Sequence, residues 1–224
     1  TNKTKKVELS KSEEKQFDSK KSIYRTGKFR KDEEKLLENH EENNDLALKN
    51  IQSTSTETNY NIGDTKTFTV TTDFSTYKEE DLKFELKKES ENAYLWVAKT
   101  ADVNQDSIDQ MSDKFNNLVY PKITNTFGRE PNSNTFNVLK KTGEKTHIVF
   151  APIKYAAGYF WSGDLYSSDR VSSSNERKMF YVSTESELPY QLSTIAHEFQ
   201  HMIFFNEEVM SDSNNSSKDT WVNE

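Results

Sequence analysis

The chain has 224 residues, with 30 lysines and arginines against 37 aspartates and glutamates, a net charge of −7, and no cysteine. The lack of cysteine excludes disulfide frameworks, cysteine-ligated zinc and thiol nucleophiles, and the acidic balance argues against a general nucleic-acid binder. No apolar stretch approaches the roughly 20 residues of a membrane-spanning helix. The polar start at Thr1 is unlike a signal peptide, although a signal could have been removed before it.

Residues 1–61 are dominated by charged and small polar side chains and contain few apolar ones. Such a segment cannot bury enough apolar surface to offset the entropy lost on ordering. We therefore expect a charged arm or linker, or the remainder of a pro-segment. A solvated helical arm packed on the main domain is the alternative reading of the same residues.

Residues 62–104 contain three short runs that are typical of β-strands. Thr67–Thr71 and Leu82–Leu86 alternate with a period of two, and Tyr94–Val97 is rich in aromatic and branched side chains. Asp and Asn residues bound these runs as turns would. The sequence thus predicts a small antiparallel β unit over this part of the chain.

Residues 105–224 change to a mixed pattern. Apolar residues spaced by three or four predict a helix over Ile108–Val119, which should end at Tyr120 because the residue before a proline avoids the α region. His147–Phe150 and Met179–Val182 are short apolar runs typical of strands. Taken together, the predicted elements indicate the α+β class.

The segment from His197 to His201 reads H-E-x-x-H. In a helix these two histidines lie about 40° apart around the axis and one turn apart along it, so both can reach one metal ion. Glu198 then lies beside the ion, free to hold a water. We expect the helix to end near Asn206. An apolar stripe opposite the histidines predicts that it is buried; its members are Leu188, Leu192, Ile195, Phe199 and Met202.

A catalytic zinc needs three protein ligands and an open position for water. No histidine follows His201, so a carboxylate has to supply the third ligand. The downstream carboxylates are Glu207, Glu208, Asp212, Asp219 and Glu224. Glu207 and Glu208 lie more than one turn past His201 on the same predicted helix and cannot readily reach back. A second helix beginning near Trp221 can bring Glu224 to the metal, and we expect this residue to be the third ligand.

The segment 196–206, with Trp221–Glu224 downstream, resembles the gluzincin metallopeptidases, and within them it is most similar to the hyicolysin family. Further matching stretches are Tyr120–Ile123, Phe127–Gly128, His147–Ile153, Gly158–Leu165 and Ser174–Tyr181. The likeness covers about residues 62–224 and does not extend to the first 61.

The resemblance implies a zincin fold, one Zn²⁺ ion and a secreted bacterial endopeptidase that acts on proteins or peptides. It also implies that His197, His201 and Glu224 are the metal ligands and that Glu198 is the general base. In that family the ligand helix continues and a further helical subdomain closes the cleft. We therefore expect residues 105–224 to be the zincin catalytic lobe without that subdomain, with weak activity or none by itself.

Zincins commonly hold the substrate extended along an exposed sheet edge. Either the strand at 147–150 or the strand at 179–182 could provide this edge. The aromatic residues Tyr159, Phe160 and Trp161 could line a substrate subsite, but core packing is the favoured interpretation.

Two further residues have alternative interpretations. His147 opens a predicted strand, and a structural, hydrogen-bonded histidine is favoured over a second functional one. Asp164 follows Gly163 in a predicted turn. It could bind a structural Ca²⁺ ion or shape the turn, and the turn is favoured.

The function that the sequence favours is zinc-dependent hydrolysis of peptide bonds by a metal-activated water, with Glu198 as general base. The alternative is a non-catalytic module that binds a surface or a protein partner and carries a structural or vestigial metal site. The two differ at Glu198, because a purely structural metal helix does not need a glutamate beside its first ligand.

Overall fold

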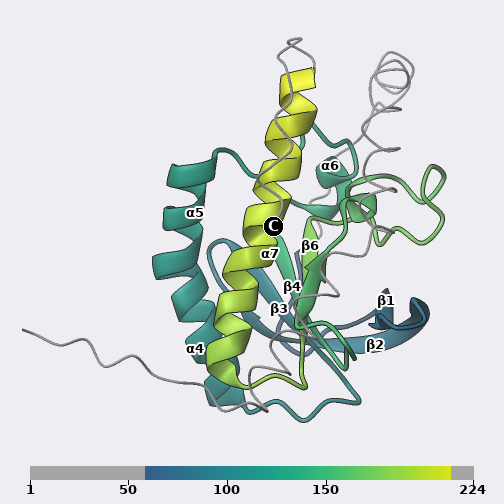
Figure 1. The fold of residues 1–224 in the computed structure, drawn as a ribbon, viewed down its shortest axis with the longest axis vertical. Coiled ribbons are helices and arrows are strands. Elements are labelled where there is room, and N and C mark those ends of the chain that lie inside the picture. Colours follow the sequence, from purple (N-terminus) through teal and green to yellow (C-terminus); the bar gives the residue numbers. More distant parts are fainter. Residues whose placement is uncertain (1–58, 213–224) are drawn as a thin grey trace, which may run out of the picture.

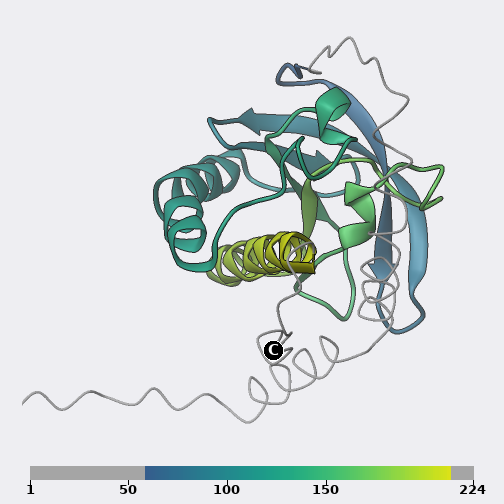
Figure 2. The ribbon, with the colours of Figure 1, turned by 90° about the horizontal axis from the view of Figure 1, so that it is seen from above.

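The computed structural model describes residues 59–212, which form a six-stranded mixed sheet with helices α4, α5 and α7 on one face (Figures 1 and 2). This arrangement is the α+β class that the sequence predicts. The strands are β1 (Thr65–Asp73), β2 (Lys78–Glu89), β3 (Ala93–Ala98), β4 (Thr146–Ala151), β5 (Gly158–Phe160) and β6 (Met179–Ser183). The helices are α4 (Gln105–Lys114), the π-helical turn η1 (Phe115–Val119), α5 (Tyr120–Phe127), α6 (Leu139–Thr142), the 3₁₀ turn η2 (Ser162–Leu165) and α7 (Leu188–Asp212).

The strands lie in the order β1-β2-β3-β4-β6-β5. The first three form an antiparallel meander, β3, β4 and β6 run parallel, and β5 is antiparallel to β6. The three strands predicted within residues 62–104 are confirmed as strands. They continue directly into the sheet of the later segment, so the proposed boundary at residue 104 does not coincide with a break in the sheet.

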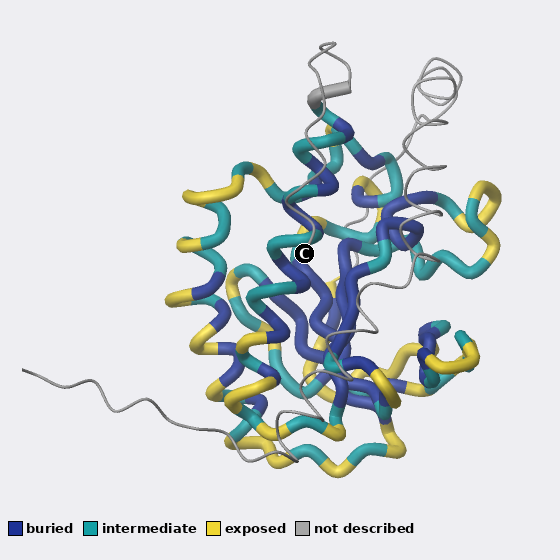
Figure 3. The backbone as a smooth tube through the Cα atoms, in the orientation of Figure 1, coloured by how far each residue is buried: buried dark blue, intermediate teal, exposed yellow. Residues whose placement is uncertain are grey.

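The strands at 147–150 and 179–182 are interior strands, so the expectation that one of them forms an exposed edge is wrong. β4 pairs with β3 and β6, and β6 pairs with β4 and β5. Every residue of both strands is buried, and the central strands are dark blue in Figure 3. A strand covered on both faces appears in a sequence as a continuous apolar run, which is the pattern that these two segments show. The edges are β1 and β5.

The sheet curls so that β1, at one end of the strand order, comes close to β5 at the other end (Figure 2). Thr71 N donates to Tyr159 Oη at 2.9 Å, and Lys154 N donates to Thr72 O at 2.9 Å. The ring of Tyr159 stacks on that of Tyr181 at 4.3 Å between centroids. These contacts occupy backbone groups of edge strand β1, which protects this edge from pairing with another chain.

The helix predicted over residues 108–119 does not end before Pro121. At η1 the chain widens into a π-helical turn, in which Tyr120 N donates to Phe115 O five residues earlier. Pro121 then lies in the first turn of α5, where its missing N–H is tolerated. The π-helical turn absorbs the break in the backbone ladder that a proline introduces, and the helix continues to Phe127.

The face of the sheet away from the helices holds an aromatic cluster around His147, whose side chain is 1% exposed. Trp96 Nε1 donates to His147 Nδ1 at 3.0 Å, and the two rings are stacked. Tyr60 packs edge-on against His147, and Tyr94 packs beside it. The structural interpretation of His147 is confirmed. Burial, with a smaller contribution from nearby Arg177 and Lys178, holds the pKa of His147 well below its usual range.

We expect His147 to make the fold less stable as the pH falls below about 6.5, the pKa of an exposed histidine. In that range the unfolded chain binds a proton that the folded chain excludes, so the slope approaches about 1.4 kcal/mol per pH unit. Burial raises the pKa of Asp164 to about 7, and this group acts in the opposite direction. The measurement is therefore a comparison: between pH 7 and 5, the wild-type protein should lose more unfolding free energy in urea than His147→Gln, which keeps an acceptor for Trp96. Equal losses would show that His147 does not cause the effect.

Candidate metal and catalytic site

Helix α7 carries the H-E-x-x-H segment along the helical face of the sheet (Figure 1). Its inner side, with Ile195, Phe199 and Met202, is fully buried in the core, whereas His197 and His201 are half-buried on the outer side. The sequence pattern therefore predicted the orientation of the helix correctly.

The expected end of this helix near Asn206 is wrong, because α7 continues to Asp212. Asn206 is fully buried, and its Nδ2 donates to Arg129 O at 2.8 Å instead of capping the helix. Val209 continues the buried side one turn further.

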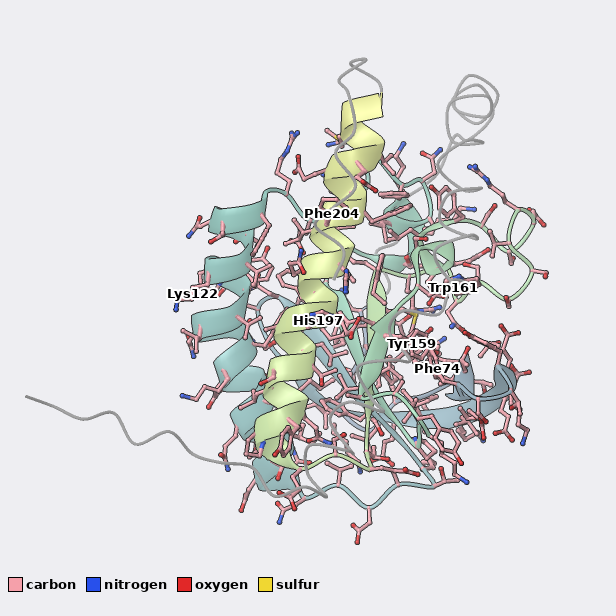
Figure 4. All side chains as sticks on the ribbon, viewed as in Figure 1. Phe74, Lys122, Tyr159, Trp161, His197 and Phe204 are labelled. Atoms are coloured by element: carbon pink, nitrogen blue, oxygen red, sulfur yellow. The ribbon has the colours of Figure 1, made fainter. Side chains whose placement is uncertain are left out.

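His197 lies in the middle of α7 (Figure 4). Its Nε2 atom lies 2.9 Å from Nε2 of His201, and the two rings are nearly perpendicular. Two nitrogens that each bind a tetrahedral zinc at about 2.0–2.1 Å lie about 3.3–3.4 Å apart. The rings, now at hydrogen-bond distance, would therefore have to separate by only about 0.4–0.5 Å to bind one ion. Burial lowers the pKa of His197, which favours the neutral ring with a lone pair available for a metal. The pair therefore fits two adjacent ligand positions of one ion.

The predicted third ligand, Glu224, lies outside the described residues. Within residues 59–212 the structure gathers no group of three or more His, Asp or Glu side chains that could hold a metal. Glu207 is directed elsewhere, since its Oε1 accepts from Arg129 N at 2.5 Å in the loop after α5. The described part of the chain thus brings together two candidate ligands, and the metal site itself stays a prediction.

Glu198 points from α7 toward strand β5 and is 1% exposed. Its Oε2 accepts from Phe160 N at 2.9 Å. This N–H is free of the ladder between β5 and β6. Ser183 N donates to Ala157 O at 2.8 Å, so the backbone groups of residue 157 point toward β6. Because backbone groups alternate in direction along an antiparallel strand, those of residue 159 also point toward β6 and those of Phe160 point away from it. The edge of the sheet therefore orients the carboxylate next to the histidines. The sequence analysis missed this contact because β5 has only three residues and Gly158 interrupts its strand pattern.

The close approach of β5 to α7 depends on Gly158. A Cβ at this position would stand 2.4 Å from Tyr181 O and 2.5 Å from Thr194 Cγ2. No other residue type fits between β6 and the helix without moving one of them.

Gly158→Ala is therefore expected to displace β5 from α7 and to weaken the contact between Phe160 and Glu198. Overpacking of this kind costs about 1–3 kcal/mol. The measurement is the free energy of unfolding in urea. A loss of less than about 1 kcal/mol would contradict the proposed close packing.

Asp164 lies in η2 and is fully buried. Its Oδ2 accepts from Tyr181 Oη at 2.7 Å, and its Oδ1 accepts from Asn175 N at 2.7 Å. The side chain of Asn175 in turn bonds both N and O of Thr69 on β1. These contacts support the interpretation that Asp164 shapes the chain locally. They use its oxygens for internal hydrogen bonds, whereas a Ca²⁺ site would need them as ligands.

The three aromatic residues considered as subsite or core lie on different sides of β5. Phe160 packs into the core under the helices, and Tyr159 packs into the core on the other face of the sheet. Both are 6% exposed, so core packing is confirmed for these two. Trp161 is half-buried at the end of the strand.

The chain shares 26% identity over 209 residues with the neutral metalloprotease ShpI of Staphylococcus hyicus. The alignment covers 86% of the chain but 45% of this relative, so the chain spans less than half of the relative's length. No protein-family model matches the chain. The similarity supports a relationship to the metalloproteases. Separately, none of the helices within residues 59–212 is long and apolar enough to cross a membrane.

Proposed function

We propose that the chain is the helix-bearing lobe of a secreted zinc endopeptidase of the hyicolysin type, with a zincin fold and protein or peptide substrates. The observation that carries the proposal is the convergence of two imidazole nitrogens, 2.9 Å apart, on the helix that also holds the buried Glu198. The similarity to a neutral metalloprotease supports the same class of activity.

His197 and His201 would hold the zinc through their Nε2 atoms, and Glu224 would complete the set of protein ligands. A bound zinc supplies positive charge that polarises the scissile carbonyl and lowers the pKa of a water toward neutrality. The two described ligands come from successive turns of one buried helix, so little reorganisation is needed for them to bind.

Glu198 is the residue that moves the proton in this proposal. One of its carboxylate oxygens is held by Phe160 N–H, which fixes the orientation of the group. The other oxygen is then placed to take a proton from the attacking water and to return it to the leaving amine. No covalent intermediate with the chain is required.

The substrate would lie along β5, which is the sheet edge beside α7. Phe160 N–H is occupied by Glu198, but the carbonyl of Phe160 and both backbone groups of Gly158 also point away from β6. An extended peptide can pair with these remaining groups through main-chain hydrogen bonds. The proposed substrate-binding edge is therefore β5, next to Glu198, and not β4 or β6, the strands that the sequence analysis considered.

The test is hydrolysis of casein by the full-length protein, with and without a zinc chelator. We expect the chelator to abolish the activity and one equivalent of added zinc to restore it. Activity that survives complete removal of the metal would exclude the proposed chemistry. Binding to a partner without hydrolysis would favour the non-catalytic alternative.

A further inference from the structure

Tyr190 exposes a large aromatic ring at the first turn of α7. The residue is 57% exposed, although the helix around it is anchored to the fold. Leu188 packs against the core, and the buried Gln191 donates from Nε2 to Ser183 O at 3.1 Å. Thr194 Oγ1 donates to Tyr190 O at 2.9 Å. The ring is therefore presented to solvent from a backbone that the surrounding contacts hold in place.

Tyr190 lies on the side of α7 that carries the two candidate metal ligands. It precedes His197 by seven residues and His201 by eleven, so in an α-helix its side chain points within about 20° of each of theirs. The spacing also places Tyr190 about 10 Å before His197 along the helix axis. This first turn is the lower end of α7 in Figure 1. Tyr190 and the two histidines thus follow one line along the helix.

This line runs beside β5, the edge on which the substrate is proposed to lie. Thr194, one turn after Tyr190, packs against Gly158, since a Cβ at Gly158 would stand 2.5 Å from Thr194 Cγ2. One turn further on, Glu198 accepts from Phe160 N at 2.9 Å. Strand β5 and α7 therefore run side by side in the same direction, and Tyr190 lies one turn before the level of Gly158.

A substrate on β5 would meet Tyr190 at a defined distance from the cleaved bond. An extended peptide advances about 3.3 Å per residue, so the 10 Å or so between His197 and Tyr190 correspond to three or four residues. Strand β5 begins at Gly158, so main-chain pairing with it stops before the level of Tyr190. Beyond that point a side chain of the substrate, and not its backbone, has to make the contact.

The surface next to Tyr190 is acidic. Glu187 O accepts from Tyr190 N at 3.0 Å, and the side chain of Glu187 is exposed. Within residues 59–212, Glu187 forms no ion pair. A cation over the face of a tyrosine ring is attracted by the ring electrons, and a nearby carboxylate adds to this attraction. A guanidinium group suits both partners, because it is planar, stacks on aromatic rings and binds carboxylates.

We propose that Tyr190 and Glu187 form a substrate subsite that selects a basic side chain, Arg above Lys, three or four residues from the cleaved bond. The guanidinium group would stack on the ring of Tyr190 and pair with the carboxylate of Glu187. The inference rests on the proposed peptidase function and on a substrate paired with β5.

The test is cleavage of a peptide library by the zinc-loaded full-length protein, with cleavage sites mapped by mass spectrometry. We expect one position, three or four residues from the cleaved bond, to be enriched in Arg and Lys. In matched peptides that carry Arg or Gln at that position, kcat/KM should be about fivefold higher for Arg. The difference should lie in KM, because a contact remote from the cleaved bond is the same in the ground state and in the transition state.

Three variants assign the preference to this subsite. Tyr190→Ala should lower the ratio of kcat/KM for Arg over Gln to about twofold or less, the share that the carboxylate alone would give. Tyr190→Phe keeps the ring and should keep the ratio. Glu187→Gln should lower the ratio about twofold.

The matched control is Phe127→Ala. Phe127 is an exposed aromatic residue of α5, and α5 lies on the other side of α7 from β5, as the labels of Lys122 and Tyr159 show in Figure 4. This variant should leave the ratio near fivefold.

The outcomes separate the two levels of the proposal. Cleavage with no preference at that position, with a preference for apolar or acidic side chains, or with a preference for Arg that Tyr190→Ala retains in full would overturn the subsite and leave the peptidase standing. No cleavage of any peptide by the zinc-loaded protein would overturn the peptidase and the subsite together.

Discussion

Replacement of Glu198 by glutamine is expected to lower the rate of peptide hydrolysis by about 10²–10⁴-fold, the usual contribution of a general base. Glutamine has nearly the same shape, and its amide oxygen can still accept from Phe160 N–H, so the fold should be retained. The metal content should also be unchanged, because Glu198 is not a proposed ligand. The loss would then come from the missing proton acceptor alone.

The measurement for Glu198→Gln is kcat for a quenched fluorescent peptide, together with zinc content and the free energy of unfolding. Glu207→Gln is the matched control. It removes a carboxylate from the same helix, but this carboxylate bonds to the loop after α5 and has no proposed role in catalysis. It should leave kcat close to that of the wild-type protein. A Glu198→Gln protein with normal turnover would require a different base.

Replacement of either His197 or His201 by glutamine is expected to remove the metal and reduce peptidase activity to background. Loss of a residue that only supports a ligand commonly costs 10–100-fold in metal affinity, so loss of a ligand should cost more than about 100-fold. Both side chains are half-buried on the outer side of α7, and their replacement should disturb the core little.

The measurement for these variants is a zinc titration against a competing chelator. His147→Gln is the matched control, since it replaces a histidine that is buried among aromatic rings away from α7. It should bind zinc like the wild-type protein. Unchanged zinc affinity in both His197→Gln and His201→Gln would remove the two histidines from the metal site.

Most of the strands and the main helix follow from the spacing of apolar residues. Ile195, Phe199 and Met202 are buried on the side of α7 that faces the sheet, as their spacing predicts. The continuous apolar runs of β4 and β6 predicted strands, but their interpretation as edges failed, since a run that is apolar at every position indicates burial on both faces.

The remaining parts of the fold depend on long-range contacts. Strand β5 is too short to carry a pattern, and it is defined by pairing with β6 and by the contact between Phe160 and Glu198. The helix continues past Pro121 because the π-helical turn before it adjusts the backbone, and no local preference of those residues indicates such a turn.

In the candidate site, too, one part follows from the local sequence and another part depends on long-range contacts. The period of the helix predicted that His197 and His201 share one side, and the structure brings their Nε2 atoms to 2.9 Å. The support of Glu198 by the sheet edge involves a backbone group 38 positions away in the sequence. A backbone N–H has no side-chain identity, so no motif could have marked it.

Zinc stoichiometry tests the central claim most directly. Native mass spectrometry of the folded full-length protein, purified without chelator and dialysed against zinc-free buffer, should show one zinc ion per chain. The double variant His197→Gln/His201→Gln should show none. A wild-type protein that remains metal-free after incubation with zinc, or a double variant that retains the ion, would contradict the account.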